Sequence, residues 1–151
     1  MLALCRTFRS LDHADRCLLI EAASSMAFVW AGLRLVRFGV LRRLLDGFAG
    51  LPTRGNPGPP DPDAIRHVRW AVTAVATRVS SATCLVQALA ADVMLRRRGL
   101  ACELRIGVRA HPASVAPLEA HAWIECGGAV AIGRIESLQD FKVLITRVAA
   151  E

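Results

Sequence analysis

The stretch SSATCLVQALAADVMLRRRG, residues 80–99, decides the fold of this chain. Its apolar residues recur at three- and four-residue steps, and a basic turn followed by Gly99 ends the pattern, so it predicts a helix with a buried face. Cys84 stands where this helix begins. The N-terminus of a helix carries unpaired N–H groups and a partial positive charge, which favour the thiolate, the nucleophilic form of cysteine. Cys84 is therefore a candidate nucleophile.

Upstream of this helix, the chain divides into helical segments and one loop. Apolar residues at helical spacing predict helices over 11–38 and 40–48 and a third over 63–79. Between them, LPTRGNPGPPDPD, residues 51–63, contains five prolines and two glycines. Proline lacks the backbone N–H that helices and central strands require, so this stretch is a linker or loop.

Downstream of residue 99 the hydrophobic period changes from that of a helix to that of strands. Residues 102–110 and 119–126 alternate as half-buried strands do, and Gly127-Gly128 predicts a two-residue hairpin turn. Further strands are expected over 130–133 and 141–148. Helices followed by three or four antiparallel strands indicate an α+β fold, with Cys84 at the edge of the sheet.

We expect three regions along the chain. Residues 1–50 form a helical N-terminal region, residues 51–63 a Pro/Gly-rich linker, and residues 64–151 a core in which the Cys84 helix packs on a small antiparallel sheet. The arginines of the N-terminal region, Arg42 and Arg43 among them, make a basic cluster that is either a solvated helix face or a docking surface for an acidic partner.

The cysteine content and the hydropathy pattern restrict the compartment. Five cysteines, an odd number with no CxxC pair, fit neither a disulfide framework nor a zinc site, and Cys102 and Cys126 are expected to be small buried residues in strands. The apolar run 22–33 has only 12 residues, too short for a transmembrane span and poorly built for a signal sequence. A cytoplasmic protein without a transmembrane segment is the expectation.

A cysteine nucleophile needs a base, and the sequence has four histidines to offer. His13, His67 and His111 lie in helices or before a proline and are expected at the surface or in packing. His121 lies in the alternating segment EAHAWIEC directly after a loop, where a strand holds an imidazole rigidly. Trp123 shares its face and is a candidate wall of a cleft.

The order of these motifs resembles a known family of cysteine enzymes. TCLVQALAADVMLRRRGLACELRIGVRA followed by LEAHAWIECGG, with SLDHADRCLLIEA near the start, resembles the leader peptidases of lasso-peptide biosynthesis, the B proteins, which have a papain-like, transglutaminase-like core. The resemblance implies a cysteine peptidase in which Cys84 is the nucleophile and His121 the base. Its substrate would be the leader peptide of a ribosomal precursor. Its partners would be a small PqqD-like leader-recognition protein and a cyclase that closes the macrolactam.

The third catalytic residue departs from the family pattern. The family often has an acid about a dozen positions after the histidine, where this chain has Gly133. If Gly127-Gly128 is a two-residue turn, pairing puts Arg134 across from His121 and Glu136 on the same face, so Glu136 is the candidate acid. Asp140 is the fallback, and a Cys-His dyad without an acid is the remaining alternative.

Other functions have weaker support from the sequence. The missing acid favours a non-catalytic peptide-binding module with the same fold. The net charge of +6 alone does not indicate nucleic-acid binding, because the arginines are spread over several elements and there is no tyrosine for base stacking. No phosphate-binding glycine loop and no metal-ligand spacing is present in the sequence, so we expect no nucleotide, cofactor or metal site.

Overall fold

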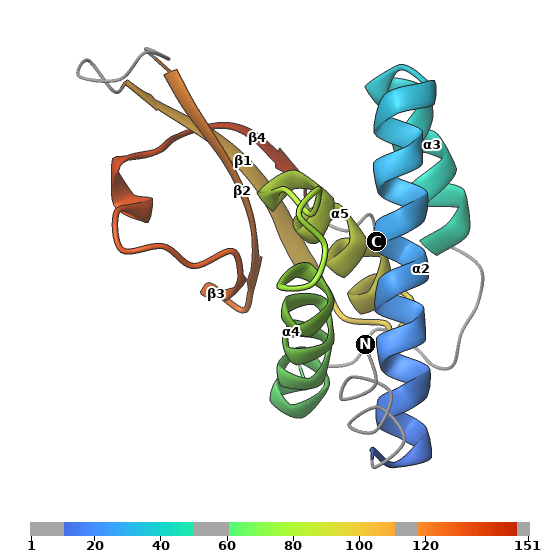
Figure 1. Ribbon diagram of the computed structural model, residues 1–151. Helices are drawn as coiled ribbons and strands as arrows, with labels where there is room; N and C mark the ends of the chain where they lie inside the picture. Colours follow the sequence, from blue (N-terminus) through green and yellow to red (C-terminus); the bar gives the residue numbers. More distant parts are fainter. Residues whose placement is uncertain (1–10, 50–60, 111–117, 148–151) are drawn as a thin grey trace.

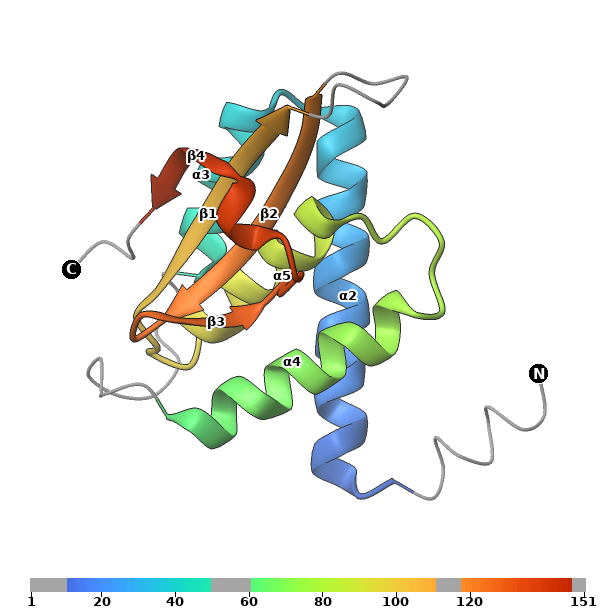
Figure 2. The ribbon, with the colours of Figure 1, turned by 90° about the vertical axis from the view of Figure 1, so that its left-hand side faces the viewer.

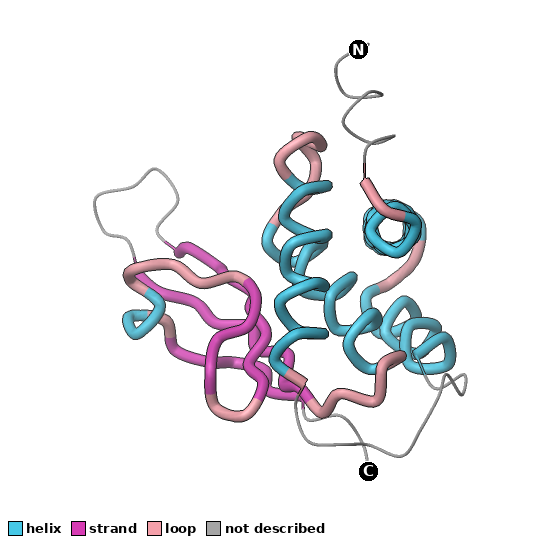
Figure 3. Tube along the Cα trace, turned by 90° about the horizontal axis from the view of Figure 1, so that it is seen from below, coloured by secondary structure: helices cyan, strands magenta, loops and turns pink. Residues whose placement is uncertain are grey.

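The protein consists of a helical layer packed against one small sheet. A computed structural model describes residues 11–49, 61–110 and 118–147. Figure 1 shows the helices on one side and the strands on the other, and Figure 3, viewed along a perpendicular direction, shows the same separation. The predicted α+β fold is confirmed.

Four helices form the first layer, and their bounds follow the sequence signals closely. Asp12 caps the first by accepting a hydrogen bond from the Asp15 N–H at 2.7 Å. Asp61 caps the third, in which Pro62 occupies the first turn, where its missing N–H costs nothing. The helices are α2 His13–Leu35, α3 Phe38–Ala49, α4 Pro62–Ala76 and α5 Cys84–Arg96.

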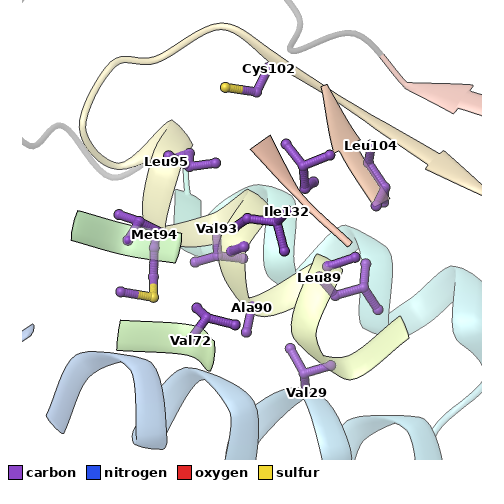
Figure 4. Packing of buried hydrophobic residues seen from close by; sticks show 14 of the residues in the cluster. Val29, Val72, Leu89, Ala90, Val93, Met94, Leu95, Cys102, Leu104 and Ile132 are labelled. Atoms are coloured by element: carbon purple, nitrogen blue, oxygen red, sulfur yellow. The ribbon is translucent and has the colours of Figure 1, made fainter. Parts of the chain in front are cut away.

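Helix α5 occupies the centre of the molecule. Every residue from Ala88 to Leu95 is buried, as is Val86. Helices α2, α3 and α4 contact α5 on one side and the sheet contacts it on the other. Figure 4 shows Leu89 and Val93 of α5 beside Leu104 and Ile132 of the sheet, and Ala90 beside Val29 of α2. The predicted buried helix is therefore buried on all sides rather than on one face.

The second layer is an antiparallel sheet of four strands in the order β3-β2-β1-β4. Even-numbered residues of the two central strands, such as Leu104 and Ile124, face the helices, because successive side chains of a strand alternate between its two faces. Odd-numbered residues, His121 among them, face the segment that joins β3 to β4. The strands are β1 Cys102–Ala110, β2 Leu118–Cys126, β3 Ala129–Ile132 and β4 Lys142–Arg147, with a 3₁₀ turn at Leu138–Asp140.

The β2–β3 hairpin has the predicted turn but not the predicted register. Gly127 and Gly128 both have positive φ, 58° and 79°, as a two-residue hairpin turn requires. Pairing then shifts by one residue, since Val130 faces Glu125 whereas Ile132 faces Ile124, and Ala131 is the additional residue of a β-bulge. Strand β3 ends at Ile132. The expected pairing of Arg134 with His121 is therefore wrong.

Cys102 and Cys126 form a disulfide bond, which corrects the expectation that both are reduced core residues. They stand opposite each other in the β1–β2 register, with their Cα atoms 4.4 Å apart. This is the spacing of a non-hydrogen-bonded antiparallel pair, whose side chains approach closely. The sequence did not show this pairing, because the register of β1 and β2 depends on the connection 111–117, whose seven residues contain two prolines but no two-residue hairpin signal that would fix the register. The cytoplasmic location stays a prediction.

Helix α2 extends beyond the 12-residue apolar run 22–33 on both sides. Its 23 residues are sufficient by length and composition for a membrane span, a test that core helices of soluble proteins also pass. Its buried residues Ala22, Met26 and Val29 pack in the core, whereas Ile20 and Phe28 are exposed. The expectation of no transmembrane segment stays a prediction.

The disulfide gives a stability prediction. The bond joins residues 24 positions apart in the sequence, so the loss of loop entropy in the unfolded chain should stabilise the fold by about 3 kcal/mol. Urea unfolding of the double variant Cys102→Ala, Cys126→Ala should show a loss of this order. A reductant should lower the stability of the wild type and leave the variant unchanged. A wild type whose urea midpoint does not respond to reductant would show that the bond is not formed.

The start of α5 gives a second prediction. The Thr83 hydroxyl accepts a hydrogen bond from the Val86 N–H at 3.4 Å, which is the N-cap of the helix. Thr83→Ala should lower the free energy of unfolding by about 1 kcal/mol, measured by urea titration. Thr83→Ser keeps the hydroxyl and should retain most of that stability. Equal losses in the two variants would rule out the cap as the source.

Candidate active site

Cys84 is the first residue of α5 and carries a free thiol of intermediate exposure. Gln87 holds the residues that precede Cys84. Its side chain donates a hydrogen bond to the Ala82 carbonyl at 2.7 Å, and its backbone N–H donates to the Thr83 carbonyl at 3.0 Å. The N–H of Cys84 itself has no acceptor within the described residues, as is usual for the first turn of a helix. It is available to a developing oxyanion beside the sulfur.

His121 lies on β2, and its imidazole is held on three sides. Nε2 is 2.7 Å from the Gly133 carbonyl oxygen, to which it donates. The ring lies parallel to that of Trp123, with centroids 6.1 Å apart and planes at 16°, and beside that of Phe141, with centroids 5.7 Å apart. These contacts fix the ring and leave Nδ1 as the nitrogen with a free lone pair.

Cys84 and His121 stand on two elements that pack on each other, α5 and β2, without a hydrogen bond between their side chains. Helix α5 packs on β2, and both views show its first turn beside β2 (Figure 1 and Figure 2). Strand β3 covers β2 only from Ile124 onward, so the edge of β2 near His121 is uncovered on that side. No hydrogen bond joins the Cys84 sulfur to the imidazole, although both residues are described. The structure therefore places the two residues on packed elements but shows no contact between their side chains.

The two candidate acids are not at the histidine. Glu136 is exposed, and in the described segments it forms no hydrogen bond with His121. Asp140 is also exposed and lies 3.7 Å from Arg109, which pairs more closely with Glu119 at 2.7 Å and stacks over the Phe141 ring. The group that does contact the imidazole is the backbone carbonyl of Gly133.

A cavity of about 700 Å³ adjoins His121 on the outer face of the sheet, under the β3–β4 connection. Trp123 and Phe141, the two rings that contact the imidazole, are part of its wall. Glu136 also lines it. The remaining lining is mixed, with apolar Val130, Ile135, Leu138 and Val143 and polar Arg105, Glu125, Arg134 and Gln139. Its mixed lining is of the kind that accepts a peptide side chain.

The other described histidines and the free thiol of Cys17 lie on helices α2 and α4. His13 and His67 are exposed on α2 and α4, and His111 is outside the described residues. Cys17 is exposed on α2, 3.7 Å from Nδ1 of His13. Among the residues that the structure describes, no three histidine, cysteine, aspartate or glutamate residues form a group that could hold a metal.

Sequence reasoning missed the Gly133 carbonyl. Backbone oxygens occur at every position, so residue type alone does not single one out. The one available signal was the spacing, because Gly133 stands twelve residues after His121, where the similar family often has its acid. The sequence indicated only that the expected acidic side chain is absent at position 133. The structure shows that the backbone carbonyl of the same residue contacts the imidazole.

Comparison with known proteins supports the same core. No curated protein and no solved structure matches the chain. The family described as Transglutaminase-like superfamily matches residues 29–146, a range that contains Cys84, His121, strands β1 to β3 and all but the last residue of β4. Members of this superfamily are generally cysteine proteases or transferases, and the domain indicates activity of the cysteine-peptidase type. By this match over most of its length, the chain belongs to the transglutaminase-like superfamily.

Proposed function

We propose that this protein is a cysteine endopeptidase that removes the leader peptide from a ribosomally made lasso-peptide precursor. Cys84 is the nucleophile and His121 the general base. The observation that carries the proposal is a free thiol on the first residue of α5, a helix that packs on β2, together with an imidazole held in one orientation on β2. Neither feature alone indicates catalysis, but nucleophilic catalysis needs both at one place.

The reaction follows from the groups present. His121 Nδ1 takes the thiol proton of Cys84, and the thiolate attacks the scissile carbonyl carbon. The carbonyl oxygen becomes an oxyanion, which the unpaired Cys84 N–H stabilises. The imidazolium returns the proton to the leaving amine as the C–N bond breaks. Water, deprotonated by His121, then hydrolyses the thioester, releasing the acid and the free thiol.

The lasso-peptide substrate and its partners rest on the resemblance of the sequence motifs. A PqqD-like recognition protein would present the leader, and a cyclase would take the product. The basic cluster on α3, represented by Arg42 and Arg43, is the proposed docking surface for the recognition protein. A non-catalytic peptide-binding module is the alternative, and it keeps the cleft but does not need the thiol.

The reactivity of Cys84 separates these two functions. At pH 6 an ordinary thiol is well under about 1% ionised, so a thiolate–imidazolium pair should make Cys84 at least roughly tenfold faster with limiting iodoacetamide than Cys17. Mass spectrometry of each cysteine gives the rates. His121→Ala should remove the advantage. His13→Ala is the matched control, since it deletes the histidine beside Cys17 and should leave Cys84 unchanged.

A Cys84 that reacts as slowly as Cys17 in the wild type would contradict the peptidase in the isolated chain and favour the binding module. For that module, Cys84→Ala would also preserve function completely.

Docking gives a further prediction. In a reaction containing a lasso precursor and a PqqD-like protein, Arg42→Glu with Arg43→Glu should slow cleavage roughly tenfold or more by repelling an acidic partner, while alkylation of Cys84 stays unchanged. Arg66→Glu with Arg69→Glu on α4 makes the same charge change on exposed residues of another helix. If the α4 variant slows cleavage as much as the α3 variant, net charge rather than docking on α3 is responsible.

A further inference from the structure

We infer that the backbone carbonyl of Gly133 is the group that orients the catalytic imidazole, in place of an acidic side chain. Its distance of 2.7 Å from Nε2 is that of a good hydrogen bond. The part of the inference that calls this imidazole catalytic rests on the proposed function. Gly133 is here a positioning residue, because it acts through His121 and touches no substrate.

The hydrogen bond determines which nitrogen is the base. A carbonyl oxygen only accepts, so Nε2 must carry the hydrogen in neutral His121, and Nδ1 carries the lone pair. The rings of Trp123 and Phe141 lie against the imidazole and limit its rotation. The hydrogen bond thus selects one tautomer. Together with the two ring contacts, it also selects one orientation of the imidazole.

The backbone at this position requires glycine. Gly133 has φ of +80°, a conformation that side chains with a Cβ adopt only with strain. A Cβ built there would lie 2.8 Å from the Ala122 carbonyl oxygen and 3.0 Å from the Trp123 Cβ. The obstructing atoms are main chain or next to it, so they cannot move aside. Any side chain at 133 would therefore shift the carbonyl away from His121.

The hairpin itself supplies a matched control. Gly128 has φ of +79°, but a Cβ there would meet no atom within 4 Å, and Gly128 lies in the turn away from His121. Gly128→Ala thus introduces the same backbone strain as Gly133→Ala without the collision. A difference between the two variants reports on the carbonyl rather than on glycine in general.

The tautomer of His121 is the direct test. At a pH above 8, nitrogen NMR of histidine in the Cys84→Ala background should show only the Nε2–H form. Gly128→Ala should keep that form, and Gly133→Ala should give a mixture of both tautomers. A predominant Nδ1–H form in the Cys84→Ala protein overturns the inference, and this reading does not depend on whether Gly133→Ala folds.

Reactivity of the thiol is the second readout. With Cys84 restored, Gly133→Ala should slow alkylation of Cys84 at pH 6 about tenfold, whereas Gly128→Ala, Glu136→Gln and Asp140→Asn should stay within about twofold of the wild type. A tenfold loss in Glu136→Gln would assign the orienting role to the acid instead. If Cys84 is unreactive in the wild type while NMR shows only the Nε2–H form of His121, the proposed function is wrong, but the hydrogen bond from His121 to the Gly133 carbonyl is supported.

Discussion

The complete burial of α5 is the constraint on which the rest of the structure depends. A helix with buried residues all round must be covered on every side, so three helices and a sheet are all needed to remove it from water. Its N-terminus is the part that remains accessible, because Thr83 is exposed and Cys84 only partly covered. The same packing that anchors the helix therefore leaves the thiol partly accessible on the first residue of a buried helix.

The β-bulge at Ala131 determines what stands beside the imidazole. Without the additional residue, β3 would continue along β2 and would bring Arg134 opposite His121. With it, the strand ends at Ile132 and the chain turns at Gly133, so that a carbonyl points at Nε2. One additional residue thus changes the group that contacts the His121 imidazole.

How much could be predicted from the sequence depended on whether a feature is local. Hydrophobic period and cap residues predicted the helices and strands within a few positions, and the position of Cys84 at a helix start needs only its neighbours. The two-glycine turn was also predicted, because positive φ at adjacent positions leaves a clear signal. The Cys102–Cys126 bond and the Gly133 contact depend instead on strand register. A connection longer than a two-residue turn, or a single bulge, changes that register without a local sequence signal.

The absence of an acid at position 133 is compatible with catalysis. The geometry explains why the missing acid and the carbonyl contact with His121 occur at the same residue. An aspartate there would place its Cβ against the Ala122 carbonyl, so a carboxylate and this backbone exclude each other. A neutral carbonyl selects the tautomer and the ring orientation but contributes no negative charge to the imidazolium. Orientation therefore comes from the main chain and from two aromatic rings that restrict the imidazole. On this account the bulge and Gly133 form one feature, since neither would place an acceptor at His121 without the other.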